Sequence, residues 1–302
     1  MLIGVQGLHS PWVMDDLNIL SCVSFQTTLF KYEDFCWLRD QWLPRFQLEK
    51  ISFEIEEISE SFRRYLKGNT EWYKRASLEA KKIRSYNANL VYPGHCDYPK
   101  LFLQLACPPL ALVYLGHPIW NQLSGLAVVG SRSPSDLSLA WMEEHLARFL
   151  ARNEVFLLSG AARGIDQRAH AIALRVGRPT VAIIPSGFEK IYPPEFKQWV
   201  YEIIRGNGAV LSEYSIDQLM YKNLFCQRNR LIAGMTEKVF IVEAARKSGT
   251  IMTANYALEQ DRDVAVLPSH PGVGRCLGGI DLLSQGAKLI VEEADLTVWM
   301  RS

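Results

Sequence analysis

The fold is decided by residues 126–164, LAVVGSRSPSDLSLAWMEEHLARFLARNEVFLLSGAARG. Two short apolar runs, at residues 126–129 and 155–158, enclose a stretch with helical character. A run that is apolar at every position predicts a strand covered on both faces, and a helical spacer allows a parallel crossover. We therefore predict a strand, a helix and a second strand of one parallel sheet.

The same rhythm continues towards the end of the chain. Further apolar runs occur at residues 180–184, 209–211, 239–242, 264–267 and 288–291, with helical stretches between them. The most economical arrangement is an α/β fold, a doubly wound and mostly parallel sheet of about six or seven strands.

The chain before residue 85 has a different pattern. Residues 12–84 carry apolar side chains at helical spacing, such as Phe62, Tyr65 and Leu66, without the alternation of strands. Residues 86–118 are rich in proline and glycine, which is typical of a connecting arm. We predict a small helical N-terminal domain at 1–84, of SAM-like or similar type, and a larger α/β domain at 85–302.

The composition limits the classes of function. The 302 residues are 48% apolar with a net charge of +1, so the chain can form a core and has no general attraction for DNA or anionic membranes. Any nucleic-acid site must be a local concentration of Lys and Arg. The start has no signal-like pattern, and no run of about eighteen apolar residues occurs. We predict a cytoplasmic protein without membrane contact, and the His and Cys spacings predict no metal site.

Glycine, serine and basic residues gather just after the predicted strands. In an open parallel sheet, ligands bind beyond the carboxyl ends of the strands. Glycine and serine alone are explained by the tight turns that such a fold needs. Positive charge in the same turns favours an anion pocket instead; it comes from Arg132, Arg163, Arg246 and Lys247.

The segment at residues 221–230, YKNLFCQRNR, adds two arginines that flank an asparagine, with an aromatic ring three residues earlier. Arginine binds phosphate through two hydrogen bonds, and an exposed ring offers a face for a base, so the segment suits single-stranded nucleic acid. The alternative is structural: Arg228 pairs with Glu213 or Glu243, and Phe225 lies in the core.

Motifs of catalysis are mostly missing. The chain has no P-loop for ATP and no nucleophile elbow. Asp166, Glu213 and Glu243 are candidates for a carboxylate cluster, but the more usual roles are the first helical turn for Asp166 and the orientation of arginines for the glutamates. We predict no catalytic residue.

Five strings occur in a fixed order along the chain: VVGSR (128–132), SGAARGIDQRAH (159–170), LSEY (211–214), RNRLIAG (228–234) and VEAARKSGTIMTA (242–254). Their joint occurrence and spacing resemble a known family, the DNA-processing protein DprA, also called Smf. The resemblance implies an extended Rossmann-like fold that binds single-stranded DNA without strong sequence preference, forms a homodimer and helps to load the RecA recombinase during natural transformation or recombination. It implies no enzyme activity and no cofactor.

The resemblance also implies a set of DNA-binding residues. Carried over by position, they are Ser131, Arg132, Arg163, Lys222, Phe225, Arg228, Asn229, Arg230, Lys247, Ser248 and Gly249. In this interpretation Arg132, Lys222 and Lys247 hold phosphates and Phe225 stacks on a base. Asn229 bonds either a base edge or a neighbouring loop.

The chain departs from the family pattern at three places. Ser215 and Ser269 stand near positions where relatives have proline and glycine, and Ile280 replaces an asparagine. We expect local changes at the rim of the site or at the dimer face. The chain also stops shortly after the predicted sheet, without the winged-helix-like extension of many relatives, so no second DNA-contacting module is expected.

Two other functions stay open at this point. Ser248, Gly249 and Thr250 have a likeness to the end of the loop in phosphoribohydrolases, which predicts a hydrolase of nucleotides or sugar phosphates, although the first glycines of that loop are missing. The tryptophan-rich region at 1–84 is alternatively a protein-docking module.

Overall fold

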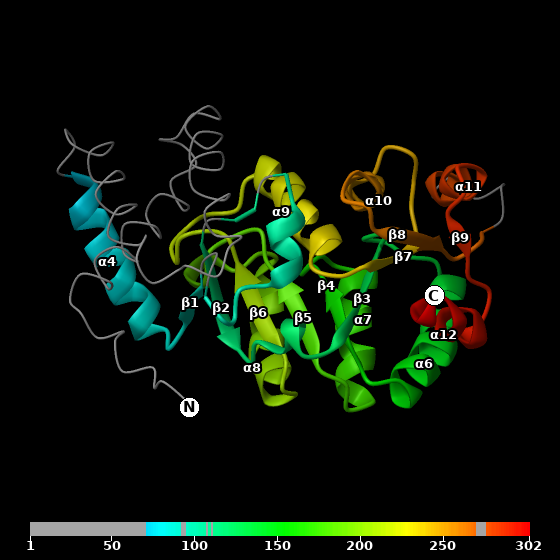
Figure 1. Cartoon of the computed structure of the whole chain (residues 1–302), viewed down its shortest axis with the longest axis horizontal. Helices are drawn as coiled ribbons and strands as arrows, with labels where there is room; N and C mark the ends of the chain where they lie inside the picture. The colour runs from blue at the N-terminus through cyan, green and yellow to red at the C-terminus, as the bar shows by residue number, and fades with distance from the viewer. Residues whose placement is uncertain (1–70, 92–94, 107, 110, 270–275) are drawn as a thin grey trace, which may run out of the picture.

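The sheet organises the whole described part of the chain (Figure 1). The structure is a computed structural model that describes residues 71–91, 95–106, 108–109, 111–269 and 276–302. Its nine strands have the order β1-β2-β6-β5-β4-β3-β7-β8-β9. Their bounds are β1 Asn89–Val91, β2 Leu112–Gly116, β3 Ser124–Gly130, β4 Val155–Ser159, β5 Thr180–Ile183, β6 Ala209–Ser212, β7 Lys238–Glu243, β8 Asp263–Val266 and β9 Lys288–Leu289.

The strand order reverses at one point in the middle of the sheet. The chain passes from β3 through β4 and β5 to β6 in one direction, and then returns to place β7 on the other side of β3. The strands from β6 to β9 are parallel, whereas β2 and β1 continue the sheet in antiparallel pairing. The loops after β3 and β7 leave in opposite directions, which opens a crevice at their carboxyl ends.

Helices cover both faces of the sheet. In Figure 1, α9, α10 and α11 lie on one side, and α6, α7, α8 and α12 lie on the other. The helices are α4 Glu71–Ser85, α5 Asp136–Trp141, α6 Ala147–Arg152, α7 Ile165–Arg175, α8 Lys197–Arg205, α9 Lys222–Gly234, α10 Gly249–Glu259, α11 Leu277–Ser284 and α12 Glu293–Arg301. A π-helical turn, Met142–Leu146, joins α5 to α6.

The two layers of helices explain the continuous apolar runs. In β3, Leu126 and Val128 pack in the cluster that contains α7, whereas Ala127 and Val129 pack in the cluster that contains α9. Side chains that alternate between two buried faces must all be apolar. The prediction of a doubly wound, Rossmann-like α/β fold is therefore confirmed.

The elements before the parallel strands differ more from the sequence prediction. The arm expected at 86–118 contains β1 and β2, which extend the sheet past β6. The helical domain expected at 1–84 lies outside the described residues except for α4, so its boundary stays a prediction. Ile83 of α4 packs in a core cluster with Val113, Val210 and Ile203 of the α/β part.

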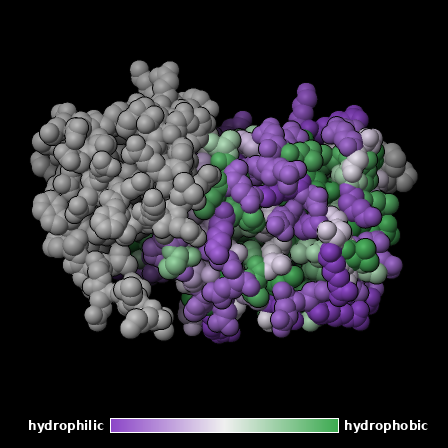
Figure 2. All heavy atoms as spheres, in the orientation of Figure 1, coloured by the Kyte–Doolittle hydropathy of each residue, from purple (hydrophilic) through white to green (hydrophobic). Residues whose placement is uncertain are grey.

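The surface of the described part is mostly hydrophilic on the face in Figure 2, with smaller apolar areas between the polar side chains. None of the helices within the described ranges combines the length and the apolar character that a bilayer-crossing helix requires.

Candidate nucleic-acid interface

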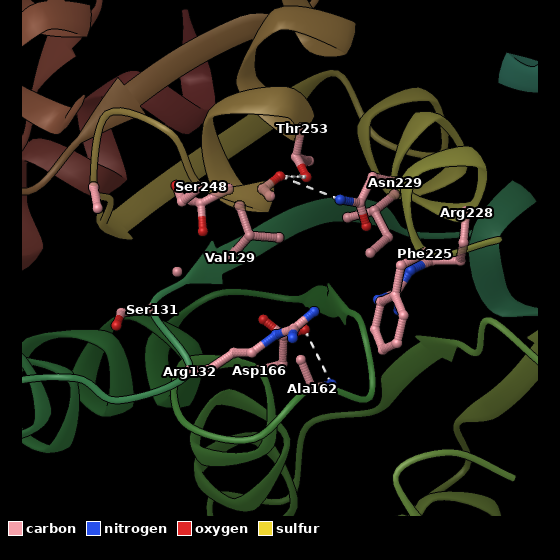
Figure 3. Close-up of a pocket in the computed structure, with 15 residues that line it drawn as sticks. Val129, Ser131, Arg132, Ala162, Asp166, Phe225, Arg228, Asn229, Ser248 and Thr253 are labelled. Carbon is pink, nitrogen blue, oxygen red and sulfur yellow. Dashed lines mark hydrogen bonds between the residues drawn. The ribbon is translucent and has the colours of Figure 1, made fainter. Parts of the chain in front are cut away.

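A pocket of about 360 Å³ lies at the reversal point of the sheet (Figure 3). Its walls come from the end of β3 and the following turn, the loop after β4, one side of α9 and the start of α10. This is the crevice in which open α/β sheets bind their ligands. The fold therefore brings together segments that are more than a hundred residues apart in the chain.

Seven of the eleven predicted site residues line this pocket: Ser131, Arg132, Phe225, Arg228, Asn229, Ser248 and Gly249. The structure does not bring the other four, Arg163, Lys222, Arg230 and Lys247, into its wall.

The geometry of α9 explains which of its residues face the pocket. Phe225, Arg228, Asn229 and Ile232 are spaced by three, four and seven residues, so they share one side of the helix. Arg230 is two residues beyond Arg228, a rotation of about 200°. Its guanidinium pairs instead with the carboxylate of Glu213, which corrects the expectation that both arginines of the RNR string line one pocket.

The other expected basic residues lie at the surface. Arg163 pairs with Glu195, and Arg246 donates two hydrogen bonds of 2.7 and 3.0 Å to the carboxylate of Asp281. Lys222 and Lys247 are exposed; Lys222 begins α9, and Lys247 directly precedes the pocket residue Ser248. The two lysines therefore flank the pocket along the chain, whereas the two arginines are already paired.

Arg228 is the most buried cation of the pocket, with 2% of its surface exposed. Its Nη1 donates to the carbonyl of Ile183, and its Nε has no hydrogen-bond partner within the described residues. Burial lowers the pKa of Arg228 to about 10, and the nearby carboxylate of Asp166 opposes this shift. The expected ion pair with Glu213 or Glu243 is absent from the described part of the chain.

Asp166 adds a buried carboxylate to the same pocket. It lies in the first turn of α7, as predicted, and its Oδ2 accepts a hydrogen bond of 3.3 Å from the backbone N–H of Ala162. Burial raises its pKa to about 6, and the positive charge of Arg228 opposes that rise. The charge of Arg132 acts in the same direction as that of Arg228.

The three candidate carboxylates do not form one cluster. Glu213 orients Arg230, as predicted. Glu243 contacts no arginine in the described residues: its Oε2 accepts hydrogen bonds of 3.0 and 2.8 Å from the N–H and hydroxyl of Ser135, and one of 2.9 Å from Ser138. Glu243 therefore fixes the start of α5, and the prediction that it orients an arginine is wrong.

The Phe225 ring lies against both pocket arginines. The Cζ atoms of Arg132 and Arg228 are 4.8 and 5.4 Å from the ring centroid, distances typical of cation–π contacts. The ring of Tyr192 meets it edge-on at 5.8 Å. Phe225 is only partly buried, so it belongs to the pocket wall rather than to the core.

The start of α10 forms the opposite wall. Ser248 caps the helix by accepting a hydrogen bond of 3.4 Å from Ile251 N–H. Asn229 and Thr253 each donate a hydrogen bond of 3.2 Å to the carbonyl of Gly249, as the dashed lines in Figure 3 show. Of the two expected roles of Asn229, the structure shows the bond to a neighbouring loop. The N-terminus of α10 contributes positive potential.

Sequence reasoning missed several pocket residues. Val129 and Ile232 form apolar walls, and Thr253 binds the start of α10. The helical spacing of Ile232 from Phe225 and of Thr253 from Gly249 is the signal that would have found the last two. The departures at Ser215, Ser269 and Ile280 are not in the pocket wall.

One group of potential metal ligands occurs in the described ranges, at His95, Cys96 and Asp97, whose ligand atoms lie within 4.8 Å of one another. They are consecutive in sequence, so a search for ligand spacing does not detect them. The Nδ1 of His95 accepts a hydrogen bond of 3.1 Å from the N–H of Asp97. Closure of a tight turn accounts for the arrangement.

The fold and the pocket define a Rossmann-like α/β protein whose switch-point pocket is lined by two arginines and an aromatic ring. Residues 89–300 match the family described as DNA recombination-mediator protein A, and the chain belongs to this family.

Curated relatives agree with the match. The chain is 37% identical over 214 residues to protein Smf of Synechocystis, and 34% identical over 199 residues to the DNA processing protein DprA of Streptococcus pneumoniae. These alignments cover 70% and 66% of this chain. The chain spans about half the length of the Synechocystis relative, 53%, and 70% of the pneumococcal one.

Solved structures are similar over most of the chain. The X-ray structure of DprA from Streptococcus pneumoniae has a TM-score of 0.72 at 25% identity and covers 96% of this chain and 97% of that one. A structure of DNA processing protein A from Helicobacter pylori, which describes the single-stranded DNA binding mode of that protein, has a TM-score of 0.62 at 30% identity. It covers 69% of this chain and 93% of that one.

Proposed function

We propose that this chain binds single-stranded DNA in the pocket at the β3/β7 reversal point, as a non-enzymatic recombination mediator. The observation that carries the proposal is the Phe225 ring, which lies against Arg132 and Arg228 next to the N-terminus of α10. A ring supplies a stacking face, and the exposed Arg132 guanidinium and the helix terminus supply sites for phosphate.

Arg132 is the principal phosphate-binding residue in this proposal. Its side chain is exposed, and no carboxylate in the described ranges lies within 4.0 Å of it. Arg163, Arg230 and Arg246 each have an acidic partner and are less available. Lys222 and Lys247 extend the binding path on either side of the pocket as further phosphate contacts.

The Helicobacter pylori relative supports the choice of single strands over duplex, since its structure describes single-stranded DNA binding. A pocket of this size also favours a base outside a duplex, because in a duplex the stacked neighbouring bases cover the face that would contact Phe225. We do not assign a hydrolase activity, because the first glycines of the phosphoribohydrolase loop are missing before Ser248, and the candidate carboxylate Glu243 is bound to two serines outside the pocket.

The RecA recombinase and a second copy of this chain are the partners that we propose from the family. The sheet ends at β9, an edge strand whose surroundings expose Leu289, Val291 and Val298 by 46%, 53% and 67%. An apolar sheet edge favours pairing with another chain. Sedimentation of the wild-type and Leu289→Lys proteins tests the proposed dimer, which the lysine should weaken. The rate at which RecA assembles on a single strand, with and without this protein, tests the mediator role. We also propose a cytoplasmic location, because handling of DNA together with RecA takes place there.

Fluorescence anisotropy with a labelled single strand and the matching duplex tests the proposed function. We expect the single strand to bind more tightly, with a slope of log K against log salt of roughly −2 to −3 for about three or four phosphate contacts. Arg132→Ala should weaken binding and reduce the magnitude of that slope by about 0.7. Arg163→Ala is the matched control and should change binding little, because Arg163 is paired outside the pocket. Equal effects of the two changes would refute the pocket assignment.

A further inference from the structure

The pocket contains an acidic side chain that binding of phosphate does not explain. Asp166 lines the pocket wall together with Arg132 and Arg228, and 5% of its surface is exposed. A phosphate beside this carboxylate would be repelled, and the repulsion is stronger in a partly buried site than in water. The part of the DNA that comes close to Asp166 is therefore not the backbone.

The surroundings of Asp166 suit a nucleobase. Val129 and Ile232 give the pocket apolar walls, and the Phe225 ring lies across from Asp166 and Arg132 in Figure 3. A flat heterocycle buries its faces against such groups and keeps its polar edge for hydrogen bonds. A pocket of about 360 Å³ is at the small end of the range for ligand sites and suits one nucleotide.

The carboxylate is held in place before any ligand arrives. Oδ2 accepts the N–H of Ala162, and the absence of a side chain at Gly160 lets the Arg228 guanidinium and the Asp166 carboxylate approach each other. A Cβ atom at Gly160 would lie 2.5 Å from Oδ2 and would overlap Nη1 of Arg228. With a pKa near 6, Asp166 is an ionised acceptor at neutral pH.

We infer that Asp166 reads the Watson–Crick edge of a base that enters the pocket and favours guanine. The inference rests on the proposed function. An ionised carboxylate only accepts hydrogen bonds. Guanine presents two adjacent donors, N1–H and the 2-amino group, and thymine presents one, N3–H. Adenine and cytosine each place a ring nitrogen acceptor beside their amino group, which opposes the carboxylate. Phosphate contacts still bind every sequence, and Asp166 adds a preference at one nucleotide.

Competition by mononucleotides tests the inference on the full-length chain. The deoxynucleoside monophosphates of guanine, thymine, adenine, cytosine and hypoxanthine each displace a labelled oligothymidylate, followed by anisotropy. A mononucleotide cannot bind in several alignments as a strand can, so its affinity reports binding at a single site. A bidentate contact discriminates between bases by roughly 5-fold to 100-fold, so we expect the guanine nucleotide to compete better than those of adenine and cytosine by such a factor.

Hypoxanthine gives a control that needs no variant. It retains N1–H but lacks the 2-amino group, so its nucleotide should compete several-fold less well than that of guanine. Asp166→Asn should bring the five nucleotides within about twofold of one another, because an amide both donates and accepts. Asp136→Asn is the matched variant, since Asp136 is also a first-turn acid but is exposed and outside the pocket wall. It should retain the preference.

The possible outcomes separate the two proposals. If the oligothymidylate binds and all five nucleotides compete equally, or none competes up to its solubility limit, the role of Asp166 is refuted and the proposed function stands. If the preference for guanine persists in Asp166→Asn, the role of Asp166 is likewise refuted. If the wild-type chain binds no single strand, the proposed function fails, and the inference fails with it.

Discussion

At the scale of single residues, the pocket depends on a close approach that only glycine permits. Gly160 has no side chain between the Arg228 guanidinium and the Asp166 carboxylate, so the two groups approach each other, and Gly164, with φ of +79°, turns the chain into α7 against the carbonyl of Ser131. His170 holds the loop after β4 in place. Its Nε2 lies 2.7 Å from the carbonyl oxygen of Gly160, and its Nδ1 lies 2.7 Å from the hydroxyl oxygen of Thr180.

Gly160→Ala tests this packing. The added methyl group would overlap the buried Arg228 side chain, which cannot move into solvent, so we expect a loss of about 1–3 kcal/mol in the free energy of unfolding. Binding of single-stranded DNA should fall as well. Urea unfolding measures the first effect. Gly249→Ala is the control for stability, because its methyl group would meet its nearest neighbour, Asn229, at an ordinary 3.7 Å. Similar losses in both variants would contradict the account.

Two of the buried titratable groups, His170 and Asp166, predict opposing effects of pH on stability. Burial lowers the pKa of His170 from 6.5 to about 4. Between these values the unfolded chain binds a proton that the folded chain does not bind, so the free energy of unfolding falls as the pH is lowered. Burial raises the pKa of Asp166 from 3.8 to about 6, so between these values the folded chain takes up the proton first, and stability rises on acidification. Each effect reaches about 3 kcal/mol near pH 4.

Asp166→Asn removes one of these effects and leaves the other. Its free energy of unfolding should fall relative to the wild type as the pH drops from 6 to 4, whereas that of His170→Gln should rise relative to the wild type between pH 6.5 and 4. Urea unfolding across this range measures both differences. Curves that stay parallel to the wild type would show that neither group titrates as its burial requires.

Residue patterns predicted part of the pocket and failed where helix geometry decides. The string RNR predicts two cooperating arginines, but alternate positions of a helix point in nearly opposite directions, so Arg228 faces the pocket and Arg230 faces Glu213. Asp166 was placed correctly at the start of its helix. Its depth in the pocket could not be predicted, because burial depends on α9, which is distant in sequence.

At the scale of elements, the parallel strands were predictable and the antiparallel edge was not. Strands covered on both faces are apolar at every position, so the apolar runs predict the positions of β3 to β8 to within about two residues at each end. β1 and β2 are short and lie in a segment rich in proline and glycine, which concealed them. They extend the sheet beside β6, and Val113 of β2 shares a core cluster with Ile216 of the loop that leads into α9.

Helix α4 contacts the loop that precedes α9. The carboxylate of Glu79, with 6% of its surface exposed, accepts a hydrogen bond of 2.6 Å from the N–H of Ile216, and Lys82 pairs with Asp217. The loop continues to Lys222, where the pocket helix begins. The position of α9 therefore depends in part on a helix that precedes the sheet.

Glu79→Ala tests this dependence. It leaves the buried N–H of Ile216 without its acceptor, which should cost about 1–3 kcal/mol in the free energy of unfolding, and it should weaken binding of single-stranded DNA by loosening the start of α9. Lys82→Ala removes a surface pair on the same helix and should cost less than about 1 kcal/mol. Thermal unfolding and anisotropy measure the two effects. A larger loss in the free energy of unfolding in Lys82→Ala than in Glu79→Ala would contradict the claim that Glu79 is the main contact between α4 and this loop.

At the scale of the whole molecule, the near-neutral net charge means that binding of DNA depends on the local pocket. A net charge of +1 gives the protein no general attraction for duplex DNA, so binding must come from the few cations and the ring at the reversal point of the sheet.

Photocrosslinking tests the central claim most directly. An oligothymidylate that carries 5-iododeoxyuridine is bound to the full-length chain and irradiated, and the linked peptide is identified by mass spectrometry. We predict a crosslink at Phe225, suppressed by unlabelled oligothymidylate and lost in Phe225→Leu. Crosslinks confined to peptides outside the pocket, unchanged by Phe225→Leu, would contradict the claim that this ring and its arginines hold the single strand.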